Sequence, residues 1–161
     1  MDYIIDIDDT FKRLSYYDFK DIKLIRLQRL NLSNNNFRFI PKSIEVLKSL
    51  ERLNFSYNEI RYVHNEVCLL PSLKYLNLFY NDIQSLFKNI IFLNKVQYIN
   101  LNINLIIYFS IDYLKYCRSV RHMIIHRNPR NDKEFKHNPY LLRFENDRNN
   151  DKVIKDLYRL C

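Results

Sequence analysis

Four histidines are the side chains in this sequence best suited to metal or acid–base chemistry, and only two of them are spaced for it. His122 and His126 are separated by an even number of positions, which puts both side chains on one face of an extended strand. A metal site needs at least a third ligand, and the strand expected beside this one offers Tyr98, Asn100 and Asn102 instead. We therefore expect two exposed cationic side chains here and no metal centre.

The composition argues against the common catalytic and cofactor-binding motifs. The sequence has no glycine, and both phosphate-cradling loops and dinucleotide fingerprints require it. No arrangement of Ser, His and Asp recurs in register either. We expect no enzyme activity and no cofactor, and we expect Asn or Asp to occupy any turn position with a positive φ.

A repeat of 23 residues organises most of the chain. Its copies start at Leu27, Leu50, Leu73, Val96 and Val120, so the step is 23 three times and then 24. Each copy fits the template LxxLxLxxN. The three leucine positions of this template hold an apolar residue in every one of the five copies, which makes fifteen matches. In a chain that is 47% hydrophobic, this agreement has a chance probability of roughly 10⁻⁵. The closing asparagine is present in every copy, as Asn35, Asn58, Asn81, Asn104 and Asn128.

The second half of each copy carries a matching apolar pattern. Apolar residues occur 23 and 46 positions after each of four apolar residues of the first copy, Phe37, Ile40, Ile44 and Leu47. Each copy therefore predicts a short strand, a turn and a longer return segment around one shared core.

The first copy, LQRLNLSNNNFRFIPKSIEVLKSL, resembles the 23-residue intracellular subclass of leucine-rich repeat proteins, as in Ras-suppressor-like signalling adaptors. The resemblance implies an α/β fold, a right-handed solenoid with a parallel concave sheet of about five strands and capped ends. We expect a single domain, 1–161, in which five repeats occupy 27–128. The segment 1–26 is expected to be an N-terminal cap or a degenerate repeat. The segment 129–161 resembles a C-terminal cap, with Val153, Ile154, Leu157 and Cys161 on one helical face.

Two asparagine columns run through the repeats. The closing asparagines are expected to form a structural ladder that hydrogen-bonds backbone groups of neighbouring repeats. The second column occupies the fifth position of each repeat and faces outward. We favour the interpretation that these asparagines stack on one another as a ladder over the alternative that they contact a ligand. The members of this column are Asn31, Asn54, Asn77 and Asn100.

Cysteine usage and the amino terminus favour an intracellular location. Cys68, Cys117 and Cys161 are an odd number without metal-like spacing, and Cys117 falls in a core column. The start MDYIIDIDD has neither a positive charge nor a long apolar run, so it does not resemble a secretion signal. We expect a cytoplasmic protein, with the nucleus as the alternative, and no membrane span.

Aromatic and basic residues concentrate at the outward positions of the predicted concave face. Neighbouring strands lie roughly 4.8 Å apart, so these side chains are expected to merge into one patch. Exposed aromatic residues flanked by arginine are typical of interaction hot spots. The predicted partner-binding residues are Arg29, Arg52, Tyr57, Lys74, Tyr75, Phe79, Tyr80, Tyr98, Arg121 and His122.

These features predict a non-catalytic adaptor that binds a protein in its concave groove. The net charge of +8, from 26 Lys and Arg against 18 Asp and Glu, favours an acidic partner surface. The resemblance points to a small GTPase, a phosphatase subunit or a ubiquitin-ligase component. One alternative is binding of RNA or other single-stranded nucleic acid, in which cations meet phosphates and tyrosines stack on bases. Another is that some of the 13 tyrosines merely cover the sheet.

Overall fold

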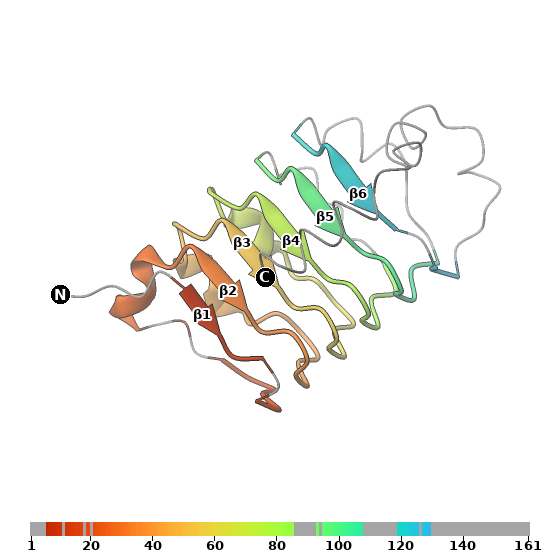
Figure 1. Cartoon of the computed structure of the whole chain (residues 1–161), viewed down its shortest axis with the longest axis horizontal. Helices are drawn as coiled ribbons and strands as arrows, with labels where there is room; N and C mark the ends of the chain where they lie inside the picture. Colours follow the sequence, from red (N-terminus) through yellow and green to blue (C-terminus); the bar gives the residue numbers. More distant parts are fainter. Residues whose placement is uncertain are drawn as a thin grey trace.

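Six short parallel strands follow one another along the molecule and form a single sheet. The computed structural model describes residues 6–10, 12–17, 19, 21–85, 93, 95–107, 119–125 and 127–129. The strands are β1 (Asp6–Asp8), β2 (Arg29–Asn31), β3 (Arg52–Asn54), β4 (Tyr75–Asn77), β5 (Tyr98–Asn100) and β6 (His122–Ile124). Figure 1 shows them side by side in chain order, with the turns that follow them aligned along one edge.

The strand register follows the period of the sequence. Leu30 pairs with Leu53, Leu53 with Leu76, and Leu76 with Ile99, so each step advances by 23 residues. The last step, from Ile99 to Met123, advances by 24. The predicted α/β solenoid with a parallel sheet is thus confirmed, although the described residues form six strands and not about five.

The core is formed by the apolar positions of the template. In β2 to β6 the central residue points inward and is almost completely buried, and in β1 the central Ile7 is partly buried. The two neighbours of each central residue point outward because side chains alternate across a strand. Phe37 and Phe55 fill the space behind the turns and meet edge to face, with ring centroids 5.2 Å apart.

The return segments described by the structure contain short 3₁₀ helices. They are η1 (Ile22–Arg26), η2 (Lys42–Val46) and η3 (Asn65–Leu69). Leu24 of η1, Ile44 of η2, and Val67 and Cys68 of η3 are buried, so each helix contributes at least one apolar side chain to the core opposite the sheet. Pro41 precedes η2, where its fixed φ suits a helix start and its missing N–H is not needed.

The segment before the first full repeat extends the sheet. Asp6 pairs with Arg29 in register, and the backbone N–H of Asp9 donates to the carbonyl of Asn31 at 2.9 Å. The Asn35 side chain also accepts a hydrogen bond from the Leu14 backbone N–H at 2.9 Å. This segment therefore stacks as a repeat although it lacks most of the template.

The C-terminal cap predicted for 129–161 lies outside the described residues beyond Pro129, as do Cys117 and His126. Within the described part of the chain, no helix has the length and apolar character needed to cross a membrane.

Candidate interaction surface

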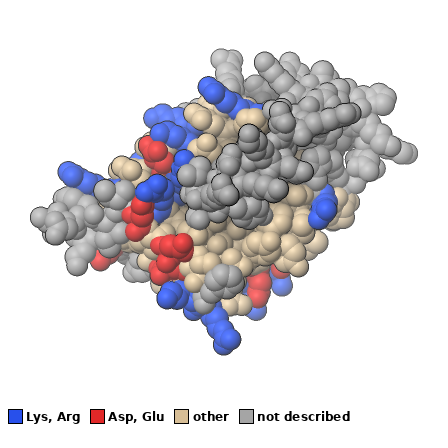
Figure 2. Space-filling view, viewed as in Figure 1, with Lys and Arg blue, Asp and Glu red and all other residues tan. Residues whose placement is uncertain are grey.

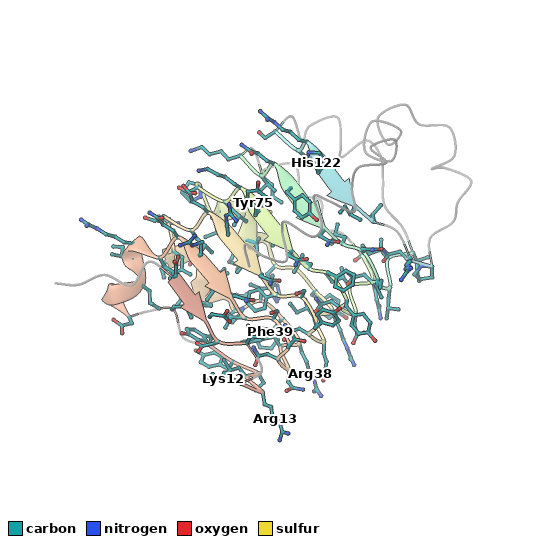
Figure 3. All side chains as sticks on the ribbon, in the orientation of Figure 1. Lys12, Arg13, Arg38, Phe39, Tyr75 and His122 are labelled. Carbon is teal, nitrogen blue, oxygen red and sulfur yellow. The ribbon has the colours of Figure 1, made fainter. Side chains whose placement is uncertain are left out.

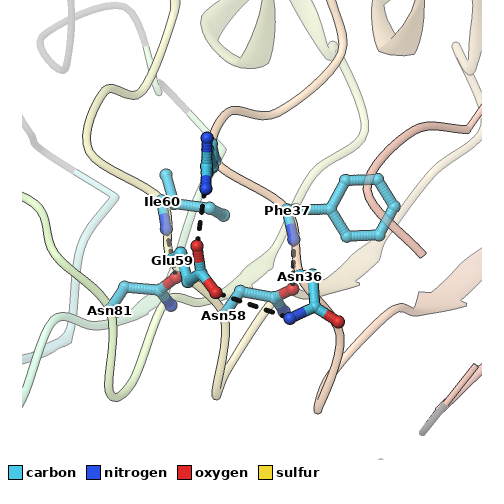
Figure 4. A network of polar contacts seen from close by, with 7 residues as sticks. Asn36, Phe37, Asn58, Glu59, Ile60 and Asn81 are labelled. Carbon is cyan, nitrogen blue, oxygen red and sulfur yellow. Dashed lines mark hydrogen bonds and ion pairs between the residues drawn. The ribbon is translucent and has the colours of Figure 1, made fainter. Parts of the chain in front are cut away.

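The closing asparagines connect each turn to the repeat before it. The Nδ2 of Asn58 donates to the carbonyls of Leu32 at 3.0 Å and Phe55 at 3.1 Å, and its Oδ1 accepts from the Phe37 N–H at 3.0 Å. Asn81 repeats this arrangement one coil further, and Figure 4 shows the bonds from both residues to the preceding turn. Because these buried amides are occupied by backbone groups, they have little left to offer a ligand.

The outward asparagine column is also engaged within the fold. The Oδ1 of Asn31, Asn54, Asn77 and Asn100 accepts a hydrogen bond from the backbone N–H two residues later, at 3.0 to 3.2 Å. The Asn54 amide donates to the Asn31 side chain at 3.0 Å, which links two neighbouring strands. These contacts favour the stacked ladder over a ligand contact.

One outward row crosses the sheet at the first residue of each strand. This row, called the strand-start row below, consists of Asp6, Arg29, Arg52, Tyr75, Tyr98 and His122. The Arg52 guanidinium carbon lies 4.7 Å from the ring centroid of Tyr75, a cation–π geometry. The rings of Tyr75 and Tyr98 are 5.8 Å apart, and those of Tyr98 and His122 are 6.5 Å apart. Figure 3 shows Tyr75 and His122 on this face of the sheet.

Two of the cations predicted to meet a partner are paired within the fold. Arg29 forms an ion pair and hydrogen bonds with Asp6, and these hold the pKa of the Asp6 carboxyl below its usual value. Lys74 pairs with Glu51 at 2.8 Å. Among the lysines and arginines predicted to meet a partner, Arg52 and Arg121 are therefore left without an acidic partner among the described residues.

Tyr98 does not lie on the surface as predicted. Only 6% of it is exposed, so the expectation of an exposed side chain is wrong at this position, whereas its role in partner binding stays a prediction. Tyr75 and His122 flank its ring on the two adjacent strands. Tyr98 supports its neighbours in the row and offers little area of its own.

The predicted aromatic patch is divided into two groups. Tyr57 contacts the rings of Phe79 and Tyr80, both at 5.1 Å, in the turns that follow β3 and β4. Ring contacts among the described residues do not join this group to Tyr75. Phe79 comes four residues after Tyr75, which corresponds to roughly 13 Å of extended chain, so the two groups occupy opposite ends of the strands.

The turns hold non-glycine residues in the left-handed backbone region. The φ angles lie between 53° and 56°, and the residues in the full repeats are Asn34, Tyr57, Tyr80, Ile103 and Arg127. The expectation that Asn or Asp would occupy such positions holds at Asn34 alone. The sequence signal that would have identified these residues is their place directly before each closing asparagine, because the same turn recurs in each repeat.

The described residues contain no group of three or more His, Cys, Asp and Glu side chains placed to hold a metal ion. His122 contacts Tyr98 instead, and Cys68 is buried in the core of the return segments.

Comparison with known proteins agrees with this geometry. Residues 25–83 match the family model for the leucine rich repeat. A leucine-rich repeat protein of Leptospira interrogans, LIC12759, is 25% identical with a TM-score of 0.68, over 73% of this chain and 30% of that one. The internalin InlF of Listeria monocytogenes is 20% identical with a TM-score of 0.58, over 73% of this chain and 34% of that one.

A structure described as a TLR13–ssRNA13 complex is 23% identical with a TM-score of 0.61, over 70% of this chain and 17% of that one. This chain thus spans about a third or less of the length of these proteins. No curated protein matches the sequence. The fold is that of a leucine-rich repeat solenoid, and the matches support a leucine-rich repeat protein, a class that serves generally as interaction modules.

Proposed function

We propose that this chain is a non-catalytic adaptor that binds an acidic protein segment on the outward face of its sheet. The observation that carries the proposal is the strand-start row, in which Arg52, Tyr75, Tyr98 and His122 form an unbroken series of side-chain contacts over four strands. The intracellular location and the partner classes suggested by the first repeat belong to the same proposal.

The row is positioned by rigid backbone. β3, β4 and β5 each pair on both sides in a fixed register, β6 pairs with β5, and the turns beside the strands are tied by the asparagine ladder. The Tyr75 ring holds the Arg52 guanidinium in place before any partner arrives. Little side-chain entropy is then lost on docking, which favours affinity.

The charge distribution defines where an acidic partner would bind. Asp6 neutralises Arg29 on β2, and Glu51 neutralises Lys74 next to β4. Arg52 and Arg121 have no acidic partner among the described residues, and a planar guanidinium binds a carboxylate through two parallel hydrogen bonds. We expect carboxylates of the partner to lie across β3 to β6.

Peptide display on the immobilised chain tests this proposal, followed by titration of the selected peptide. The Arg52→Gln/Tyr75→Ser double variant should weaken binding about tenfold or more, because it removes both the cation and the ring that holds it. The control is Arg61→Gln/Tyr62→Ser, which alters the same two residue types at exposed positions away from the strands. Equal affinity of the two double variants would contradict a binding site on the sheet face.

Nucleic-acid binding is the second candidate, and the contact of Arg52 with Tyr75 is the observation that favours it, since bases stack on such pairs. The internal pairing of Arg29 and Lys74 weakens this candidate because fewer cations remain for phosphates. Titration with single-stranded RNA over a salt series separates the two. A steep loss of affinity with salt supports RNA binding, and absence of binding at low salt removes it.

A further inference from the structure

The turns after the strands form a second surface, on the edge of the solenoid and not on the face of the sheet. Its outward apolar residues, together called the turn edge, are Tyr57, Phe79, Tyr80, Ile103, Leu105 and Ile107. The proposed binding on the sheet face does not involve these residues.

The backbone of the turn edge is unfavourable for the residues that occupy it. Tyr57, Tyr80 and Ile103 have φ values of 55°, 54° and 53°, a region that suits glycine and asparagine and disfavours bulky or β-branched residues. Burial does not offset this cost for the tyrosines, because Tyr57 is 40% and Tyr80 52% exposed. Bulky side chains kept in a strained and exposed position indicate a role outside the fold.

The apolar character increases along this edge. Leu105 and Ile107 are 43% and 64% exposed, whereas the equivalent residues one repeat earlier are Asp82 and Gln84. The Leu105 N–H donates to the Ile83 carbonyl at 3.0 Å, which fixes this segment against the preceding coil. The aliphatic side chains are therefore presented to solvent by an ordered backbone.

Cations flank the apolar residues at both ends of the edge. Arg13, Arg61 and Arg127 are exposed and have no acidic partner among the described residues, whereas Arg38 pairs with Glu59 at 3.3 Å. Figure 3 shows Arg13 and Arg38 at the lower edge of the molecule, where the turns lie. In Figure 2 the part of this edge further along the chain is mostly uncharged. Positive charge at both ends opposes pairing with a second copy of this chain and favours an anionic partner.

We propose that the turn edge docks onto an anionic lipid surface. Ile103, Leu105 and Ile107 would enter the boundary of the acyl chains, and Tyr57 and Tyr80 would lie at the level of the headgroups, where amphipathic rings accumulate. The flanking arginines would meet anionic headgroups. A line of turn tips suits a flat surface, and the sheet face remains accessible to a protein partner.

Vesicle co-sedimentation of the full chain tests this inference. Wild type should bind vesicles of phosphatidylcholine with phosphatidylserine about tenfold more strongly than vesicles of phosphatidylcholine alone, and salt should weaken the binding. Tyr80→Asn/Ile107→Ser should reduce the partition coefficient about tenfold, since two interfacial side chains are lost. Asparagine tolerates the left-handed backbone, so this variant keeps the turn.

The matched control is Tyr62→Asn/Leu69→Ser, which removes a tyrosine that is 61% exposed and a leucine that is 55% exposed on the return segments. This control should bind vesicles as wild type does. The inference is overturned if wild type does not sediment with anionic vesicles at low salt, or if the control loses as much binding as the turn-edge variant. It is also overturned if the turn-edge variant binds vesicles as strongly as wild type does, while sedimentation velocity shows that this variant has lost a dimer that wild type forms. The Arg52→Gln/Tyr75→Ser variant should still bind vesicles, which separates this test from the sheet-face proposal.

Discussion

The side-chain oxygen of Asn81 accepts a hydrogen bond from the backbone N–H of Ile60, which is 2.9 Å away and belongs to the preceding repeat. The Nδ2 of the same amide donates to the carbonyl of Phe55 at 2.9 Å and to that of Leu78 at 3.2 Å. One buried side chain thus satisfies backbone groups in two adjacent coils, at a place where no strand pairing reaches them.

Replacement of Asn81 by alanine should therefore destabilise the fold. We expect a loss of about 1 to 3 kcal/mol, because buried backbone groups lose their partners. Urea denaturation measures it. Asn36→Ala is the control, since Asn36 is exposed and, among the described residues, its side-chain amide donates only to Glu59, at 3.4 Å. This variant should change stability by less than about 0.5 kcal/mol. Equal midpoints for the two variants would show that the ladder contributes little.

Leu76→Ala should be more damaging than loss of the asparagine. Leu76 is 2% exposed at the centre of β4, so truncation leaves a cavity between two neighbouring coils and should cost about 2 to 5 kcal/mol. The matched control is Leu69→Ala, at a position that is 55% exposed. Guanidinium denaturation of both variants gives the comparison. A similar small loss in both would mean that the coils are not packed on Leu76.

Ile103→Asn should stabilise the protein. Ile103 has a φ of 53°, which is unfavourable for a β-branched residue, and asparagine should recover about 1 kcal/mol. Thermal unfolding followed by circular dichroism measures the change. Ile107→Asn serves as control because Ile107 is more exposed and is not among the residues with positive φ. An increase in melting temperature for the control but not for Ile103→Asn would refute the account of the turn.

Tyr17 should make stability depend on alkaline pH. Burial, together with the negative charge and hydrogen bond of Asp9, raises the pKa of Tyr17 from 10.0 to about 12. Since the folded state favours the protonated phenol, its contribution is fully present below pH 10 and is lost as the pH rises towards 12. Urea midpoints measured across this range should fall more for wild type than for Tyr17→Phe. Parallel curves for the two proteins would show that Tyr17 titrates as an ordinary tyrosine.

The period of the sequence was sufficient to predict the strands, their parallel order and the residues of the core. Leu30, Leu53 and Leu76 are buried as expected because the template assigns each position one direction relative to the sheet. The first strand was harder to predict because Asp9 replaces a core leucine there, and backbone pairing with Asn31 makes the strand evident only in three dimensions.

The details of the outward surface could not be read from the period. Alternation along a strand predicts that Tyr98 faces outward, but it does not predict that only 6% of this residue is exposed or that rings from both neighbouring strands flank its own. The left-handed turn residues were missed for a related reason. Propensity favours asparagine, whereas at Tyr57 and Tyr80 the repeated geometry of the coil imposes the conformation on whatever residue is present.

The constant register has a consequence for how such a chain can change in length. Because β2, β3 and β4 are offset by equal steps, excision of Leu50 to Ser72 would bring Leu30 against Leu76 and Asn31 against Asn77, with complementary faces already in place. Duplication of the same stretch would be accommodated in the same way. Whole repeats can thus be lost or gained during evolution, because the residues that meet at the new junction already fit each other.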